Sequence, residues 1–151
     1  MRIGFPFRVL ILILLCILPG CILQRNLSGG IEGEVRWFEG DLMPGPDKPP
    51  AKGIAVKREV CIYRLTRTTQ AEIHDQVFFR SVETQLVRRK WTDKEGRFSI
   101  RLKPGSYSVF IMEPQGLFAN RFSGDGYINP VEVRENTVTE LMIRIDYMAA
   151  Y

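Results

Sequence analysis

The chain has 151 residues, of which 45% are hydrophobic and 25% charged, and its formal net charge is +4. These values are typical of one globular domain, and they exclude a disordered, collagenous or disulfide-built chain. The positive charge is too small to indicate a nucleic-acid-binding protein.

The first twenty residues differ from the rest of the chain in being strongly apolar. Two arginines precede ten consecutive apolar residues, Val9–Leu18. A basic start and a short apolar run predict a secretory signal peptide over residues 1–20, since a membrane-spanning helix needs about 20 apolar residues. The sequence that follows, Leu18-Pro19-Gly20-Cys21, resembles a bacterial lipobox, in which the cysteine becomes the lipidated first residue of the mature chain.

The lipobox implies a lipid anchor at Cys21. Its thiol would carry diacylglycerol and its new amino group an acyl chain such as palmitate, and two or three chains make a durable anchor. The next residue is Ile22 rather than the aspartate that retains many lipoproteins in the inner membrane, so we expect the outer membrane of a bacterial envelope. Two alternatives stay open, namely an uncleaved membrane anchor and an ordinary signal peptide followed by an unmodified cysteine.

The rest of the chain is predicted to consist of a tether and one domain. Residues 21–29 form the tether, and the eight residues after the cysteine reach less than about 30 Å when extended. Residues 30–151 form the domain. With Cys16 removed and Cys21 lipidated, Cys61 has no partner for a disulfide within the mature chain. Because it lies in the apolar run Val60–Tyr63, we expect a buried thiol.

Apolar and polar residues alternate in most of the domain, which is typical of strands with one buried face. The predicted strands are Ile31–Trp37, Val56–Leu65, Val82–Thr92, Arg97–Leu102, Ser106–Ile111, Ile128–Val133 and Val138–Tyr147. Gly- and Pro-containing turns at Asp93–Gly96 and Lys103–Gly105 predict tight connections. Seven short strands without an amphipathic helix favour an all-β sandwich.

Three segments are not predicted to be strands. Glu39–Lys52 contains four prolines and should form an extended rim loop, because proline cannot donate to a sheet. Arg67–Gln76 is polar, with a possible helical turn around Ala71–His74. Glu113–Tyr127 is rich in glycine and aromatic residues and is expected to be a loop.

Residues 92–109 read Thr-Asp-Lys-Glu-Gly-Arg-Phe-Ser-Ile-Arg-Leu-Lys-Pro-Gly-Ser-Tyr-Ser-Val. This segment resembles the carboxypeptidase regulatory-like domain, a transthyretin-like seven-stranded β-sandwich, and Gly33–Val35 matches the opening strand of that family. The resemblance implies this fold for residues 30–151. It implies no carboxypeptidase activity, which in that family belongs to a separate zinc domain. Transthyretin-like hydroxyisourate hydrolases use several histidines and end in Tyr-Arg-Gly-Ser, whereas this chain ends Tyr147-Met-Ala-Ala-Tyr151.

The sequence offers few residues for catalysis. His74 is its single histidine, so a three-histidine zinc site or a two-histidine iron site cannot form within one chain. A serine triad would need His74 with an oriented acid, and Asp75 is adjacent only in sequence. Asn120, Asp125 and Asn129 could offer oxygen atoms to calcium, but their spacing is not that of a calcium loop. We expect neither enzyme activity, a cofactor nor a metal.

Aromatic residues near loops and strand ends suggest a possible ligand site. Sugars bind to flat aromatic rings flanked by amide, carboxylate or guanidinium groups. The candidate residues are Trp37, Phe118, Asn120, Arg121, Phe122, Asp125 and Tyr127. The alternative is that these rings plug the ends of the core. The basic run Arg88–Lys90 should lie on a solvated strand, where it prevents edge-to-edge aggregation or meets anionic lipid head groups.

The sequence therefore predicts a non-enzymatic envelope lipoprotein held in the membrane through Cys21. Its domain would act as a structural or protein-interaction module. A carbohydrate-binding module using the loop aromatics is the alternative. An enzyme or a domain with a Lys–Asn crosslink ranks below both.

Overall fold

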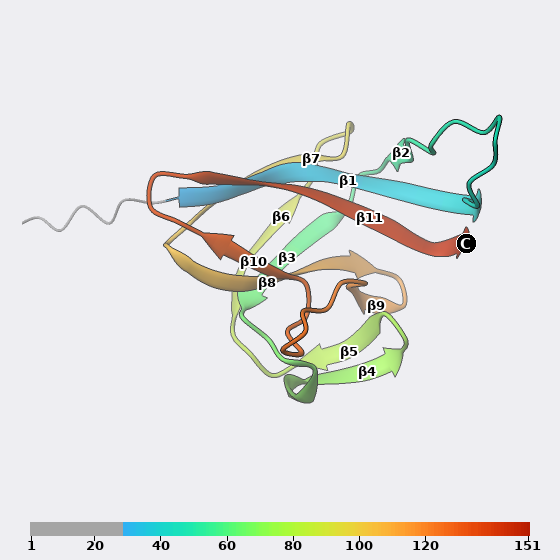
Figure 1. Ribbon diagram of the computed structural model, residues 1–151. Coiled ribbons are helices and arrows are strands. Elements are labelled where there is room, and N and C mark those ends of the chain that lie inside the picture. Colours follow the sequence, from blue (N-terminus) through green and yellow to red (C-terminus); the bar gives the residue numbers. More distant parts are fainter. Residues whose placement is uncertain (1–28) are drawn as a thin grey trace, which may run out of the picture.

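The computed structural model describes residues 29–151 (Figure 1), so the predicted signal peptide, Cys21 and nearly all of the tether lie outside the described residues. Within this range the chain is almost entirely β-structure, which confirms the predicted all-β class. The strands are β1 (Gly29–Asp41), β2 (Ile54–Ala55), β3 (Glu59–Arg64), β4 (Ala71–Asp75), β5 (Phe78–Val82), β6 (Leu86–Trp91), β7 (Arg97–Leu102), β8 (Gly105–Glu113), β9 (Gly116–Phe118), β10 (Pro130–Val133) and β11 (Val138–Ala150).

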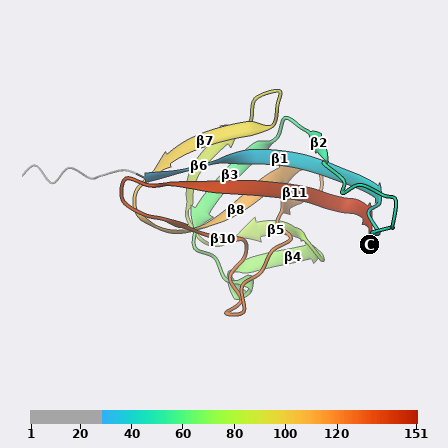
Figure 2. The same ribbon diagram turned by 45° about the horizontal axis from the view of Figure 1, so that its top comes forward.

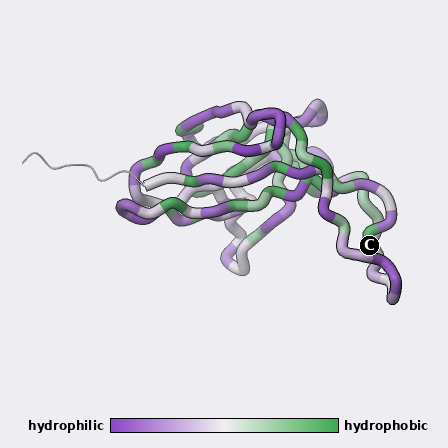
Figure 3. Tube along the Cα trace, turned by 90° about the horizontal axis from the view of Figure 1, so that it is seen from above, coloured by the Kyte–Doolittle hydropathy of each residue, from purple (hydrophilic) through white to green (hydrophobic). Residues whose placement is uncertain are grey.

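A four-stranded sheet, here called sheet A, is organised around β1. The long strand β11 runs parallel to β1, from the pair Gly30 and Val138 to the pair Asp41 and Ala150. On its other side, β1 pairs antiparallel with β7 and then with β2. Hydrophilic and hydrophobic residues alternate along these strands (Figure 3), as expected for a sheet with one face on the core and one in water.

Seven strands form the second sheet, here called sheet B. Their order is β4-β5-β9-β8-β3-β6, and β10 pairs with the first half of β8. The strands β1, β7 and β11 lie above β3 and β8 in Figure 1, and β1 and β11 pass in front of β3 and β8 when the top of the molecule is turned forward (Figure 2). The two sheets enclose a common core that includes Val35 and Ile145 of sheet A and Val60, Ile62 and Val109 of sheet B.

A second hydrophobic cluster lies on the side of sheet B that faces away from sheet A. Cys61 and Phe110 point into it from the central strands. Phe79 from β5, and Leu117 and Ile128 from either side of the loop after β9, cover them. The thiol of Cys61 is fully buried, as the apolar run around it predicts, and burial raises its pKa to about 11.

The structure corrects several predicted elements. Eleven strands replace the seven expected. The one helical turn in the described residues is a 3-10 turn at Thr68–Gln70, while Ala71–Asp75 is strand β4. Most of β4 is exposed to solvent, so its sequence lacks the alternation that marks a half-buried strand. The segment Glu113–Tyr127 is not entirely a loop, because it holds β9.

Candidate functional site

The residues predicted to bind a ligand do not form one site. Phe118 is only 1% exposed and belongs to the core between the sheets, so its assignment to a ligand site was wrong. Trp37 packs edge-on against Tyr147, with 4.9 Å between ring centroids. Phe122 instead contacts Phe79 of the second cluster. Trp37 and Phe122 therefore pack on different clusters and form no shared aromatic platform.

Asn120 has a structural partner. Its amide nitrogen donates to the Asp146 carboxylate at 2.7 Å and to the backbone carbonyl of Arg144 at 3.1 Å. Both partners belong to β11, whose other edge pairs with β1. Asn120 thus ties the segment after β9 to the outer edge of sheet A, and part of its hydrogen-bonding capacity is already used.

The remaining candidates lie in the loop that follows Asn120. Arg67, which the sequence analysis did not single out, stacks its guanidinium 4.5 Å from the Tyr127 ring centroid and donates to the Tyr127 hydroxyl at 2.9 Å. It also donates to the Asp125 carbonyl at 3.4 Å. Phe122 keeps 45% of its surface exposed, and Arg121 is exposed beside it. No local sequence signal identifies the Arg67 contact, because it joins residues 60 positions apart.

A buried polar network connects the two sheets. Glu113 of β8 has a side chain only 1% exposed, and Arg58 donates to it at 2.6 Å. The Tyr147 hydroxyl of β11 donates to the other carboxylate oxygen at 3.0 Å. Burial, and then the hydrogen bond to Glu113, raise the pKa of Tyr147. The charge of Glu113 is thus matched by one cation and one hydroxyl, and the network fixes β11 to β8.

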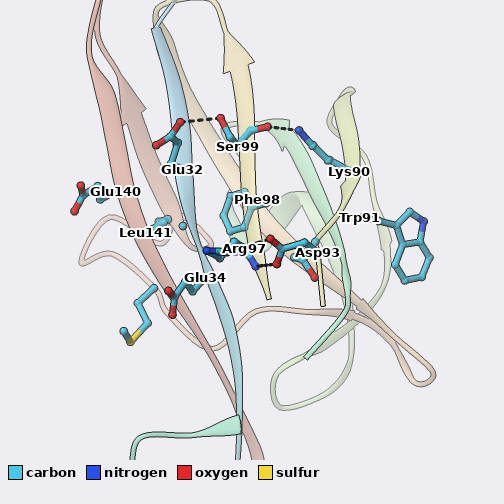
Figure 4. Close-up of a pocket in the computed structure, with 13 residues that line it drawn as sticks. Glu32, Glu34, Lys90, Trp91, Asp93, Arg97, Phe98, Ser99, Glu140 and Leu141 are labelled. Atoms are coloured by element: carbon cyan, nitrogen blue, oxygen red, sulfur yellow. Dashed lines mark hydrogen bonds and ion pairs between the residues drawn. The ribbon is translucent and has the colours of Figure 1, made fainter. Parts of the chain in front are cut away.

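A shallow groove of about 830 Å³ lies on the solvent face of sheet A (Figure 4). Three adjacent strands supply its principal side chains, because β7, β1 and β11 are neighbours in the sheet. These side chains are Glu32 and Glu34 of β1, Arg97 and Ser99 of β7, and Glu140 and Met142 of β11. We call this surface the sheet A groove. Sequence reasoning missed it because its members come from three separate parts of the chain.

Charges of both signs line the sheet A groove. Ser99 donates to Glu32 at 2.9 Å. Arg97 pairs with Asp93 at 3.1 Å, and the backbone N–H of Arg97 lowers the pKa of the Asp93 carboxyl. Glu140 forms no ion pair with any described residue. Such an open, mixed-charge surface suits contact with another macromolecule better than enclosure of a small molecule.

Beside the groove, a side-chain contact closes one flank of the domain. The Lys90 ammonium of β6 donates to the Ser99 carbonyl of β7 at 2.6 Å, which joins the edges of the two sheets. The Trp91 ring projects away from the groove carboxylates (Figure 4) and has the Lys57 ammonium 5.9 Å from its centroid. Lys90 therefore stabilises the domain edge by linking β6 to β7.

Catalytic and metal-binding arrangements are not evident in the part of the chain that is described. His74 is exposed on β4, with its Nδ1 3.1 Å from Arg80. Residues 29–151 contain no group of three or more His, Cys, Asp or Glu side chains able to hold a metal, and none of their helices could cross a membrane. The buried polar side chains in this range include no lysine, which argues against a Lys–Asn crosslink.

Comparisons with known proteins do not assign the chain to a family. No family model and no curated protein matches it. Among solved structures, a leucine-rich repeat protein from Bacteroides thetaiotaomicron aligns over 80% of this chain at 8% identity, with a TM-score of 0.34. The aligned region spans 12% of that protein. A TM-score this low supports no conclusion about fold or function.

Proposed function

We propose that this protein is a non-enzymatic outer-membrane lipoprotein, anchored through Cys21, whose β domain binds another envelope component as a structural or interaction module. The observation that carries the interaction role is the sheet A groove, an open concavity with a volume of about 830 Å³. It displays Met142 with 58% of its surface exposed, next to Glu140, which has no ion-pair partner among residues 29–151. Exposed apolar surface bordered by charge is typical of protein interaction sites.

We further propose that the domain is a carboxypeptidase regulatory-like sandwich. In support, residues 92–109 of the motif form the turn after β6, the strand β7, the β7–β8 turn and the first part of β8. Phe98 and Tyr107 of the motif are buried in the common core, and Gly96 adopts a φ of +75°, which favours glycine. Thr92 is buried, and its hydroxyl links the backbones of Val56 and Arg58.

Photo-crosslinking in cells tests the interaction role. A crosslinkable residue replacing Met142 should give a discrete adduct, and Glu140→Lys should abolish that adduct because it reverses a charge at the groove. The same crosslinker replacing Glu72, an exposed residue of β4 outside the groove, is the matched control. Adducts that are equal at both positions, or that survive Glu140→Lys, would contradict a specific surface at sheet A.

A carbohydrate-binding module is the second candidate, and the exposed ring of Phe122 favours it. Arg121 and Asp125 are exposed in the same loop and could hydrogen-bond a sugar. Calorimetric titration with glycans should then give heats that vanish in Phe122→Ala. Trp37→Ala should leave those heats in place, because Trp37 packs on Tyr147. Absence of heat with every glycan of a broad envelope panel would remove this candidate.

A further inference from the structure

One end of the domain is defined by the residue at which the tether enters. Gly29, the first residue of β1, pairs with Leu102 at the end of β7. Gly30 donates to the carbonyl of Thr137, in the turn between β10 and β11, at 3.1 Å. We call the surface formed by this turn, the β7–β8 turn and the adjoining strand ends the tether end. The carboxyl terminus lies at the opposite end of the long strands (Figure 1).

Four exposed basic residues are gathered at the tether end. Arg101 pairs across the sheet with Gly30, and Lys103 follows in the β7–β8 turn. Arg134 begins the β10–β11 turn. Arg64 ends β3 and places its guanidinium 5.9 Å from the ring centroid of Tyr107, whose hydroxyl donates to the Lys103 carbonyl at 2.7 Å.

The positive charge at this end is largely unmatched. Arg134 pairs with Glu132 of β10 at 3.1 Å, and Glu135 is the acidic residue of the turn itself. Arg64, Arg101 and Lys103 form no ion pair with any residue in 29–151. Basic side chains close to an anionic bilayer each strengthen binding by roughly fivefold. The tether end therefore has the charge that complements anionic lipid head groups.

We propose that the tether end docks on anionic phospholipid head groups and holds the domain upright on the membrane. The proposal rests on the proposed lipid anchor at Cys21. Eight residues lie between Cys21 and Gly30, so the anchor keeps this surface within about 30 Å of the bilayer. The strands β1 and β11 have 13 residues each, which puts the far end about 40 Å away.

Upright docking has a consequence for the sheet A groove. The groove lies along the side of the long strands, over β7, β1 and β11. It would therefore face laterally over the membrane surface and remain open to a partner. The basic run Arg88–Lys90, the sequence-based candidate for lipid contact, is less suited to it because Lys90 is engaged with Ser99.

The experiment uses the mature lipidated protein, which begins at Cys21, in vesicles with and without about 30% phosphatidylglycerol. A fluorophore is attached at Ser106→Cys, at the tether end, or at Ala150→Cys, at the far end, and a head-group quencher reports proximity. Cys61 is buried and should not label, which the parent chain verifies. In anionic vesicles, we expect quenching at position 106 to exceed that at position 150 by at least about threefold.

Charge variants make the test specific. Arg101→Glu combined with Lys103→Glu should bring the two quenching values together. Lys52→Glu combined with Lys94→Glu, the same charge change away from the tether end, should leave the difference intact. Equal quenching at both positions, or a difference that persists without anionic lipid, would overturn the docking proposal. Sedimentation of the parent chain with the vesicles tests the lipid anchor separately. If docking fails but the chain sediments with the vesicles, only the docking proposal is overturned. If the chain does not sediment with them, the anchor at Cys21 is refuted as well.

Discussion

The hydroxyl of Tyr147 donates a 3.0 Å hydrogen bond to the buried carboxylate of Glu113, and this contact joins sheet A to sheet B. Tyr147 also packs edge-on against Trp37 and Phe78, each 4.9 Å away between ring centroids. The ring thus contributes to the core, and its hydroxyl satisfies a buried charge. Tyr147 therefore contributes both a ring to the apolar core and a hydrogen bond to the buried carboxylate of Glu113.

Tyr147→Phe should therefore lower the free energy of unfolding by about 1.5–3 kcal/mol, because a buried carboxylate loses a hydrogen bond while the ring remains. Urea denaturation followed by circular dichroism measures the change. Tyr151→Phe is the matched control: its hydroxyl contacts Asp146 at 2.5 Å on the surface, so we expect a much smaller effect. Equal losses in the two variants would show that Glu113 gains no special stabilisation from Tyr147.

Cys61 should make stability fall at alkaline pH. Its pKa is 9.0 in the unfolded chain and about 11 in the fold, because burial disfavours the thiolate. Below pH 9 both states hold the proton, and above it the unfolded state loses the proton first. The titration of Cys61 alone should lower the free energy of unfolding by about 1.4 kcal/mol at pH 10 relative to pH 7.

The comparison of wild type with Cys61→Ala cancels the titration of all groups that do not interact with Cys61. The difference in unfolding free energy between wild type and Cys61→Ala should therefore change by about 1.4 kcal/mol between pH 7 and pH 10, because only wild type loses this contribution. The folded thiol should also resist alkylation at pH 8. Parallel stability curves, together with rapid alkylation in the native state, would contradict the buried thiol.

Asn120→Ala should free the outer edge of β11. The substitution removes both hydrogen bonds to this strand, so the carbonyl of Arg144 becomes available to another chain. We expect a loss of about 1 kcal/mol in stability and increased self-association, measured by analytical ultracentrifugation. Ser106→Ala, at an exposed position with no side-chain hydrogen bond among the described residues, should change neither quantity. A fully monomeric Asn120→Ala protein would show that the cap does not control this edge.

Gly33→Ala tests the close approach of β1 and β11. A methyl group at Gly33 would collide with the backbone carbonyl of Leu141 in the paired strand. The expected cost is about 2 kcal/mol or more, by thermal or urea unfolding, because backbone atoms cannot move aside easily. Gly124→Ala is the matched control, since no atom lies within 4 Å of a methyl group there. Equal stability of the two variants would place β1 and β11 farther apart than the structure does.

The strands with one buried face could be predicted well from sequence. The predicted strand Arg97–Leu102 coincides with β7. Exposed and buried residues alternate along the whole of this strand, so its sequence carries a clear period of two. By contrast, β5 was missed: Phe78 and Phe79 are adjacent and both buried, but they point into different clusters. A period of two is invisible where both faces of a strand are covered.

The candidate site was harder to predict than the fold. Phe118 lies in a glycine-rich segment that has the composition of a loop, yet β9 places it between β5 and β8. Its burial depends on the pairing of β9 with β5 and β8, which turns Phe118 toward the common core between the sheets. The sheet A groove depends on pairing between distant strands, since Glu32 and Ser99 are 67 positions apart. Neither arrangement leaves a local pattern in the sequence.

Mass spectrometry of the intact protein from the membrane fraction tests the lipoprotein account most directly. The account predicts a chain that begins at Cys21 and carries diacylglycerol plus an amide-linked acyl chain. In Cys21→Ser this processing should be abolished, and no lipidated mature chain should be detected. A membrane-bound protein at the full precursor mass, unchanged in Cys21→Ser, would contradict the account, because the segment before Cys21 would then be the anchor.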